Sequence, residues 1–357
     1  MILYEKELIQ KYATVNLLSK KQTKQLLKNN IDIDFIEDEI EKYLLSPDIK
    51  HLQKMFLPKN KRKTKTKSVD IKNTELLFSV AVGDAIGSRF EFTEHDYNVV
   101  NDISLITEAS DFTDDTVLSF ATKQAVDENP KKPDFRKAYL EAYKNFPDAG
   151  YGATFSRWAE EIEISNKKGY GSFANGSAMR VAYIGAYYDK VKNVIKHAIE
   201  SSMVTHNHQD GIKGAVVTAV IIWMLKNGYS KDDVYEYAKQ FYSFNDENKQ
   251  CLLHSEKYFF IDTNLNNVSN SKSRTSLFAN YAVPFAIKCF LETNSYKECM
   301  REILKHFCDT DTICAIAGGF CYTYYQEINL SKEDMINIKA KFSSWSKQFY
   351  IKELFDT

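Results

Sequence analysis

The sequence predicts an all-α protein in which a large helical domain follows a small helical N-terminal extension. Apolar residues recur at three- and four-residue steps along most of the chain, which is the spacing of one helix face. Stretches that alternate apolar and polar residues, as half-buried strands do, are rare, and only six prolines interrupt 357 residues. The composition, 44% hydrophobic and 27% charged, is typical of a folded globular protein.

The N-terminal extension is expected over residues 1–58. Helical periodicity runs from about residue 4 to 57 and predicts two or three short helices. Pro58 and a lysine-rich run then end the pattern. We therefore expect a linker at residues 59–69 and the main domain at residues 70–357.

The linker is strongly basic, whereas the whole chain carries a net charge of only −1. A chain so close to neutral has no overall electrostatic reason to bind nucleic acid or an anionic membrane. The basic run itself, KNKRKTKTK, is interpreted as an extended, solvated linker, with contact to nucleic acid or an acidic partner as the alternative.

The main domain is expected to be helical throughout. Helical periodicity predicts helices at residues 74–89, 115–127, 134–145, 178–203, 210–228, 231–243, 278–293, 295–307, 312–327 and 331–349.

Cysteine usage and apolar runs bear on location. The six cysteines form neither a CxxC pair nor a zinc-finger spacing, which indicates reduced core thiols. The N-terminus carries charges from residue 5 onward, unlike a secretory signal. The longest apolar run, Gly214 to Leu225, is about half a membrane span. A cytoplasmic protein without a membrane segment is expected.

Two acidic clusters, FTDDT at 112–116 and CDTDT at 308–312, are the sharpest features of the sequence. Each precedes an apolar-periodic stretch, so each is expected at a helix start, where Thr and Asp are favoured caps. Capping explains one side chain in each cluster. It does not explain why each cluster has two carboxylates and two hydroxyls within four residues. If both starts meet, four carboxylates repel one another unless a cation lies between them. Spacing alone leaves double capping and metal binding open.

The candidate metal site would have oxygen ligands only, because neither cluster contains His or Cys. Such a set favours Mg²⁺, Mn²⁺ or Ca²⁺ over zinc or copper. Four carboxylates can hold a pair of divalent ions about 3.5 to 4 Å apart.

Three further segments carry polar groups beside glycines or turns. Residues 83–91, GDAIGSRFE, place two glycines on a helix, allowing close approach of another backbone, and end in Glu91; helix packing with a surface Glu is the alternative. Residues 171–180 form a small-residue loop that could hold a phosphate at a helix start, or an ordinary Asn-Gly turn with a Ser cap. Residues 205–211 form a turn with two histidines, for which local hydrogen bonds are favoured over metal ligation.

Taken together, the motifs resemble a known family. GDAIGSRFE, TDDT, NGSAMR, THNHQDG and DTDTICAIAGG, in this order, are similar to the motifs of the ADP-ribosylglycohydrolase family, whose members remove ADP-ribose from modified proteins or related conjugates. The similarity covers about residues 74–330, and the order of the five motifs is far more specific than any one of them.

The resemblance implies an all-α fold with two Mg²⁺ or Mn²⁺ ions and assigns a role to each matching position. The implied metal ligands are Thr113, Asp114, Asp115, Asp309, Asp311 and Thr312. The implied catalytic carboxylates are Glu91 and Asp115. The residues expected to bind substrate are Asn175, Gly176, Ser177, Met179, Arg180 and His206.

The chain departs from the family pattern at two places. Phe307 and Cys308 stand where glycines are frequent, so a narrower cleft is expected. Ala174 offers no carboxylate where some members have a base, which leaves more of that role to Glu91.

The main functional hypothesis is hydrolysis of the N-glycosidic bond between ADP-ribose and an arginine side chain of a modified protein. The alternatives are an ADP-ribose-binding protein without catalysis and a hydrolase of another ADP-ribosyl linkage. Family members with an added N-terminal segment can act as immunity proteins against ADP-ribosylating toxins. By analogy of layout, residues 1–67 are expected to contact an ADP-ribosyltransferase toxin.

Overall fold

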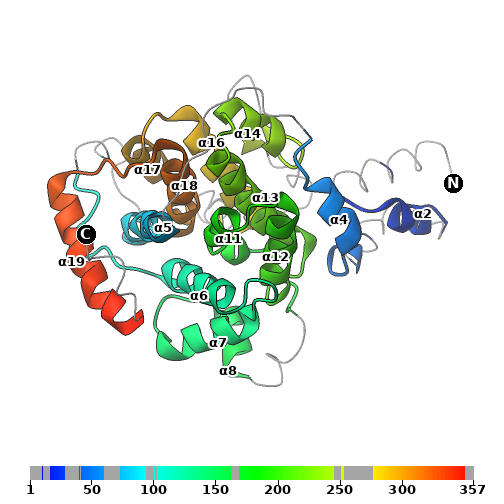
Figure 1. Cartoon of the computed structure of the whole chain (residues 1–357), viewed down its shortest axis with the longest axis horizontal. Coiled ribbons are helices and arrows are strands. Elements are labelled where there is room, and N and C mark those ends of the chain that lie inside the picture. Colours follow the sequence, from blue (N-terminus) through cyan, green and yellow to red (C-terminus); the bar gives the residue numbers. More distant parts are fainter. Residues whose placement is uncertain are drawn as a thin grey trace, which may run out of the picture.

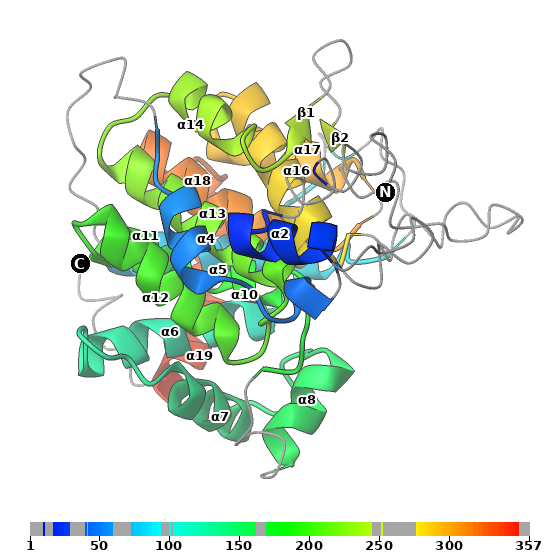
Figure 2. The ribbon, with the colours of Figure 1, turned by 90° about the vertical axis from the view of Figure 1, so that its right-hand side faces the viewer.

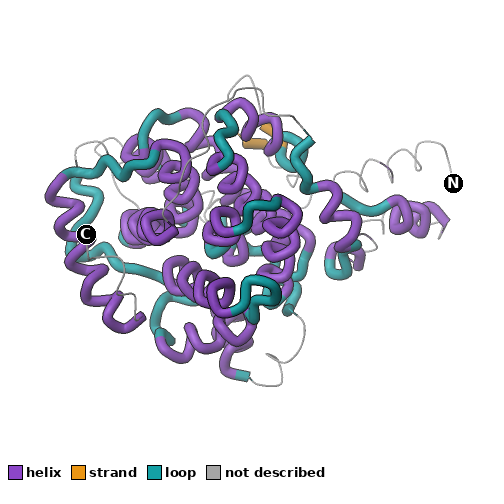
Figure 3. The backbone as a smooth tube through the Cα atoms, viewed as in Figure 1, coloured by secondary structure: helices purple, strands orange, loops and turns teal. Residues whose placement is uncertain are grey.

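The computed structural model describes residues 10, 17–28, 40, 42–59, 73–93, 100, 103–161, 169–244, 251–252, 276–306 and 308–349. Helices dominate these residues (Figures 1 and 3). The one sheet among them is a short antiparallel pair, β1 (Ser243–Phe244) and β2 (Cys251–Leu252). The all-α prediction is confirmed.

The helices fall into an N-terminal pair and a main body. The N-terminal pair is α2 (Lys20–Lys28) and α4 (Ile49–Met55). The main body contains α5 (Asn73–Ser88), α6 (Asp114–Glu128), α7 (Phe135–Asn145), α8 (Ala153–Glu160), α10 (Gly176–Met179), α11 (Ala182–Tyr187), α12 (Val191–Met203), α13 (Gln209–Lys226), α14 (Lys231–Ala238), α16 (Ala279–Glu292), α17 (Tyr296–Leu304), α18 (Thr310–Tyr325) and α19 (Lys332–Phe349).

Most predicted helices are present with ends close to those expected, and the predictions differ from the structure in three places. The segment 178–203 is divided into α10, α11 and α12 instead of forming one helix. Tyr188 is extended between α11 and α12, because its hydroxyl donates to the Pro130 carbonyl (2.7 Å) and its ring stacks on His197 (4.5 Å between centroids). Helix α8 was not predicted, and the segment predicted to be helical at 231–243 ends at Ala238.

Helices α5 and α18 pack with their backbones in close contact. A Cβ atom at Gly83 would lie 2.2 Å from the Cys314 carbonyl oxygen, and one at Gly87 would lie 2.3 Å from the Thr310 carbonyl oxygen. The close approach expected from the two glycines is confirmed. This packing brings the end of α5 beside the start of α18 (Figure 1).

The core surrounds α13 and α18, which are buried along nearly their whole length. Helices that are apolar all round need neighbours on every side, and here other helices supply them. No helix within the described residues is long and apolar enough to span a membrane. Five of the six cysteines, Cys289, Cys299, Cys308, Cys314 and Cys321, are buried and unpaired, as expected for core thiols.

The N-terminal pair is connected to the main body through α4, which lies against α12 (Figure 2). Leu52 and Phe56 belong to the main core, and the Phe56 ring lies 5.1 Å from that of Phe241. Helix α2 lies farther out, where Leu26 joins a separate small apolar cluster. Apart from Lys59, the predicted linker 59–69 lies outside the described residues.

Candidate functional site

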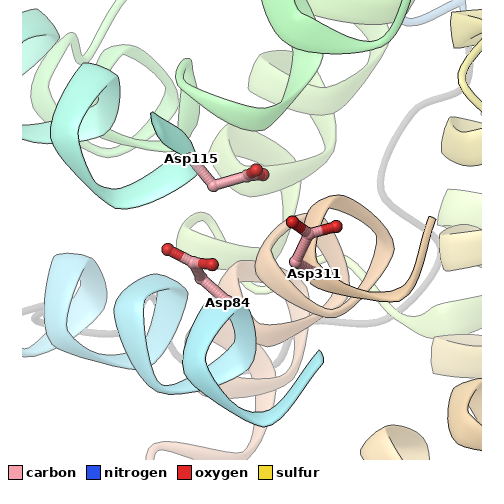
Figure 4. Close-up of side chains that lie close together, drawn as sticks. All are labelled: Asp84, Asp115 and Asp311. Atoms are coloured by element: carbon pink, nitrogen blue, oxygen red, sulfur yellow. The ribbon is translucent and has the colours of Figure 1, made fainter. Parts of the chain in front are cut away.

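Three helices bring carboxylates to one place. Asp84 lies in the second half of α5, Asp115 in the first turn of α6 and Asp311 in the first turn of α18. Figure 4 shows the three side chains converging on the space between these helices. All three residues are buried. The two acidic clusters of the sequence therefore meet in the fold.

Asp84 links α5 to the start of α6. Its carboxylate accepts hydrogen bonds from the backbone N–H groups of Thr113 (2.8 Å) and Thr116 (3.2 Å) and from both threonine hydroxyls. Sequence reasoning did not single out Asp84 as a site residue. The available signal was a carboxylate between Gly83 and Gly87 in an otherwise apolar helix, because an acid there is buried and needs partners.

The two clusters use their side chains differently. Thr113 caps α6, since its hydroxyl accepts from the Asp115 N–H (3.3 Å), but Asp309 at the start of α18 makes no such capping bond. Its Oδ2 instead accepts from the amide Nδ2 of Asn175 (2.7 Å). The Thr312 hydroxyl donates to Asp115 Oδ2 (3.1 Å) and so joins the clusters directly. Capping alone therefore does not account for the carboxylates.

The clustered carboxyl groups resist ionisation. Burial and the Asp311 charge raise the pKa of Asp84 to about 7 and that of Glu91 to about 8. The same two causes raise the pKa well above its usual range at Asp114, Asp115 and Asp309. A bound cation would favour the ionised forms, since it offsets their mutual repulsion.

The donor set fits hard divalent cations. Carboxylate oxygens of Asp84, Asp115 and Asp311 lie within 4.8 Å of one another, and so do oxygens of Glu91, Asp309 and Asp311. Asp311 belongs to both groups. Asp115 Oδ1 is buried without a hydrogen-bond partner among the described residues, so it has a free coordination position. Oxygen-only sets of this kind suit Mg²⁺, Mn²⁺ or Ca²⁺.

The carboxylates that meet between α5, α6 and α18 are called the acidic cluster below. This cluster lies at one wall of a cavity of about 560 Å³. Phe155, Tyr170, Phe173 and Phe278 supply aromatic surface to this cavity. The predicted site residues that line it are Glu91, Asp114, Asp115, Asn175, Gly176, Met179, Arg180, His206, Asp309, Asp311 and Thr312. Thr113 and Ser177 are not among the lining residues. The structure thus brings most of the expected residues together around one space.

The loop before α10 has no Ser cap, so one of the two interpretations of residues 171–180 was wrong, whereas the phosphate-holding interpretation stays a prediction. Helix α10 has four residues and begins at Gly176, with Asn175 at its N-cap. The Ser177 hydroxyl points into the core and donates to the Gly211 carbonyl (2.8 Å), so Ser177 is not the cap. Gly171 has φ +78°, a conformation that suits glycine, and directs the loop along the cavity wall.

The two histidines of the 205–211 turn make local hydrogen bonds, as favoured from the sequence. His208 Nδ1 accepts from the Asp210 N–H (3.1 Å) and caps α13. His206 Nδ1 lies 2.8 Å from the Thr205 hydroxyl. Neither histidine belongs to an acidic group that could hold a cation among the described residues.

Of the three residues that depart from the family pattern, Cys308 lies away from the cavity lining, Phe307 lies outside the described residues and Ala174 lines the cavity. Cys308 is buried and is not among the residues that line the cavity. Phe307 lies outside the described residues. The narrower cleft expected from these two positions stays a prediction. Ala174 does line the cavity and provides no carboxylate there.

Comparisons with known proteins agree on one family. A family model described as ADP-ribosylglycohydrolase matches residues 70–330. The chain is 26% identical over 297 residues to the putative ADP-ribosyl glycohydrolase L543 of Acanthamoeba polyphaga mimivirus, covering 73% of this chain and 89% of that protein. It is 28% identical over 267 residues to ADP-ribosylhydrolase ARH3 of Homo sapiens, covering 61% and 72%.

A solved structure extends the agreement to the fold. A chain of an ADP-ribosylglycohydrolase-related protein complex superposes with a TM-score of 0.52 at 18% identity. The match covers 76% of this chain and 96% of that chain. At this identity the likeness shows a shared fold.

Proposed function

The chain belongs to the ADP-ribosylglycohydrolase family, and from this premise we propose that it hydrolyses the bond between ADP-ribose and an arginine side chain of a modified protein. Family membership supports a hydrolase of ADP-ribosyl linkages in general. The observation that carries the proposal is the meeting of two acidic helix starts at the wall of one cavity.

Two divalent cations, Mg²⁺ or Mn²⁺, are proposed to occupy the acidic cluster. The proposed ligands are Thr113, Asp114, Asp115, Asp309, Asp311 and Thr312, and Asp84 joins the candidates because its oxygens lie beside those of Asp115 and Asp311. Bound there, the cations would bind ribose hydroxyls and stabilise developing negative charge on oxygen. Five carboxylates with raised pKa values are the support for a cationic occupant.

Glu91 is the proposed general base. It is half-buried at the cavity wall and belongs to the second acidic group, so its carboxylate could accept a proton from an attacking water. Asp115 is the second candidate, although its Oδ2 already accepts from Thr312. Cleavage at an anomeric carbon passes through an oxocarbenium-like state, which nearby carboxylates also stabilise.

The loop and turn that line the cavity next to the carboxylates are proposed to hold the rest of the ADP-ribosyl group. Asn175, Gly176, Met179 and His206 line the cavity there. Asn175 also donates to Asp309, which couples this wall to the acidic cluster. The aromatic rings that line the cavity suit a ligand with a flat base and sugars.

The test is release of free ADP-ribose from an arginine-ADP-ribosylated protein with Mg²⁺ or Mn²⁺ and again with EDTA. Asp311→Ala should abolish release, while Asp232→Ala, an exposed acid in the first turn of α14, should leave it unchanged. Release that survives both EDTA and Asp311→Ala would overturn the metal assignment.

Two other outcomes would redirect the proposal. Binding of ADP-ribose by the wild type without release from any conjugate would indicate a binding protein. Release from serine-linked or ester-linked conjugates, with none from arginine, would keep the reaction class and change the linkage.

We further propose that the N-terminal segment contacts an ADP-ribosyltransferase toxin, so that the protein acts as an immunity protein. The supporting observation is its position beside the cavity. A Cβ atom at Gly171, a residue of the cavity wall, would lie 2.9 Å from the Leu45 Cδ2 atom. Leu45 is 43% exposed and presents apolar surface at this rim.

Truncation separates the toxin contact from hydrolysis. Because Leu52 and Phe56 are part of the main core, the variant should lack residues 1–46 and retain α4. We expect retained release of ADP-ribose and lost binding of the toxin in a pull-down with purified components. Equal toxin binding by the full chain and the truncated chain would contradict the role of this segment.

A further inference from the structure

Arg180 is a fully buried residue of the cavity lining, and its guanidinium bonds to residues at the end of α12 and just beyond it. Its Nη2 donates to the Ser201 carbonyl (3.1 Å) and to the Thr205 hydroxyl oxygen (2.8 Å). Its guanidinium carbon lies 4.0 Å from the centroid of the Tyr139 ring. The side chain is therefore fixed by three contacts with the protein itself.

The bond from Arg180 determines how Thr205 can contact His206. Arginine has donors only, so the Thr205 oxygen must accept from it. The Thr205 hydroxyl keeps one hydrogen of its own, and His206 Nδ1 lies 2.8 Å away. A hydrogen on Nδ1 would aim a second donor at the same oxygen and leave the hydroxyl hydrogen unused in a buried site. The arrangement that satisfies the Arg180 guanidinium, the Thr205 hydroxyl and the His206 ring has Nδ1 as the acceptor of the Thr205 hydrogen.

The rest of His206 is also held in place. Its backbone N–H donates to the Ser202 carbonyl (2.7 Å), and the Ser202 hydroxyl donates to the His206 carbonyl (2.8 Å). With Nδ1 facing Thr205, Nε2 faces the cavity beside Gly176, where an added Cβ would lie 3.1 Å from it. A larger residue at position 176 would crowd this nitrogen.

We propose that Arg180 and Thr205 are positioning residues that hold His206 as the tautomer with its hydrogen on Nε2, a fixed donor to an anionic oxygen of the ligand. The diphosphate of an ADP-ribosyl group has oxygens of this kind. The assignment of the ligand rests on the proposed function. The proposal makes Arg180 a positioning residue, whereas the sequence resemblance implied direct contact between Arg180 and the substrate.

The electrostatics agree with a neutral ring. Burial, and then the charge of Arg180, hold the pKa of His206 well below its usual range. A neutral imidazole has a single N–H, so the tautomer decides whether the cavity meets a donor or an acceptor. An acceptor at Nε2 would repel phosphate oxygens.

The tautomer can be measured without any ligand. In ¹⁵N-labelled full-length protein, long-range ¹H–¹⁵N correlation spectra distinguish Nε2–H from Nδ1–H, and His206→Gln identifies the signals. We expect Nε2–H in the wild type and in Thr205→Ser, and a changed pattern in Thr205→Val. Thr218→Val is the matched control, because this buried hydroxyl has no partner among the described residues. A wild-type ring with its hydrogen on Nδ1 would overturn the proposal.

The consequence for binding is measured by titration calorimetry with ADP-ribose. Loss of one oriented hydrogen bond should weaken ADP-ribose binding about tenfold in Thr205→Val, with Thr205→Ser and Thr218→Val close to wild type. In turnover assays of Thr205→Val, KM for the ADP-ribosylated conjugate should rise by a larger factor than kcat falls. Unchanged affinity in Thr205→Val also overturns the proposal. Absence of ADP-ribose binding by the wild type would instead contradict the proposed function, and the spectra would still decide the tautomer.

Discussion

At the residue scale, Asp84 shows how one buried acid can serve both fold and site. Its carboxylate accepts from Thr113 and Thr116 and so holds the first turn of α6 against α5. Its oxygens also lie within 4.8 Å of those of Asp115 and Asp311. An ionised acceptor forms stronger hydrogen bonds than a neutral one, so charge at this position supports both roles.

Asp84→Asn should weaken cation binding and destabilise the start of α6. The amide removes one negative charge and aims an NH₂ group at threonine donors. We expect affinity for Mn²⁺ to fall at least about tenfold, and the free energy of unfolding to fall by about 1 to 3 kcal/mol. Calorimetric titration and urea unfolding measure the two effects. Asp232→Asn is the control, and unchanged Mn²⁺ affinity in Asp84→Asn would argue against a cation beside it.

Glu91→Gln tests the proposed base. The amide keeps the size of the side chain and cannot take up a proton, so kcat should fall by about 10² to 10⁴. ADP-ribose affinity should stay within roughly threefold of wild type if Glu91 acts on the nucleophile. Single-turnover assays provide the rate, and Glu141→Gln, an exposed position on α7, provides the control. A kcat close to wild type would move the role to Asp115.

At the element scale, the pairing of α5 with α18 decides whether the acidic cluster exists. Gly83 and Gly87 allow the two backbones to touch, and this contact places Asp84 next to the first turn of α18. The hydroxyl of Thr310 donates to the Gly87 carbonyl (2.8 Å) at the same crossing. Helix packing and site geometry are therefore one feature.

Gly87→Ala should disrupt this crossing. The added methyl would lie 2.3 to 2.4 Å from Thr310 and Asp311 backbone atoms, which cannot move aside as a flexible side chain could. We expect a loss of about 3 kcal/mol or more in the free energy of unfolding, together with loss of cation binding. Denaturant unfolding tests this against Gly152→Ala, where an added methyl meets nothing within 4 Å. Equal stability of the two variants would contradict the close packing.

At the scale of the whole molecule, the cavity concentrates negative charge in a chain with a net charge of only −1. The folded protein raises the pKa of Asp84 to about 7 and of Glu91 to about 8, whereas both groups have values near 4 in an unfolded chain. Without a cation, the folded state therefore binds more protons than the unfolded state between about pH 4 and 8. Its stability should fall as pH rises through this range.

Thermal melting with and without Mg²⁺ measures this dependence of stability on pH. We expect EDTA-treated protein to melt at a lower temperature at about pH 8 than at about pH 5.5, because the carboxylates ionise against one another. Excess Mg²⁺ should raise the melting temperature more at the higher pH, since it binds the ionised groups. Mg²⁺ at about 100 times its Kd should increase the free energy of unfolding by about 2.7 kcal/mol. An equal effect at both pH values would count against the acidic cluster as the binding site.

The sequence by itself determined the helical class, most helix positions and the two acidic clusters, because these depend on local periodicity and on residue types close together in the chain. It also indicated close packing at Gly83 and Gly87. It did not assign Asp84 to the site, and it predicted one helix where α10, α11 and α12 form. Those features depend on partners distant in sequence, such as Thr113 for Asp84 and Pro130 for Tyr188.

Only the tertiary structure decided which predicted residues share one space. It joined the clusters through the bond from Thr312 to Asp115, turned the Ser177 hydroxyl to the core and placed Arg180 behind His206. The physical reason is that a side chain's direction follows from the packing of its helix against others, which local sequence does not encode. Residue type limits the chemistry that is possible, and packing determines which groups meet to perform it.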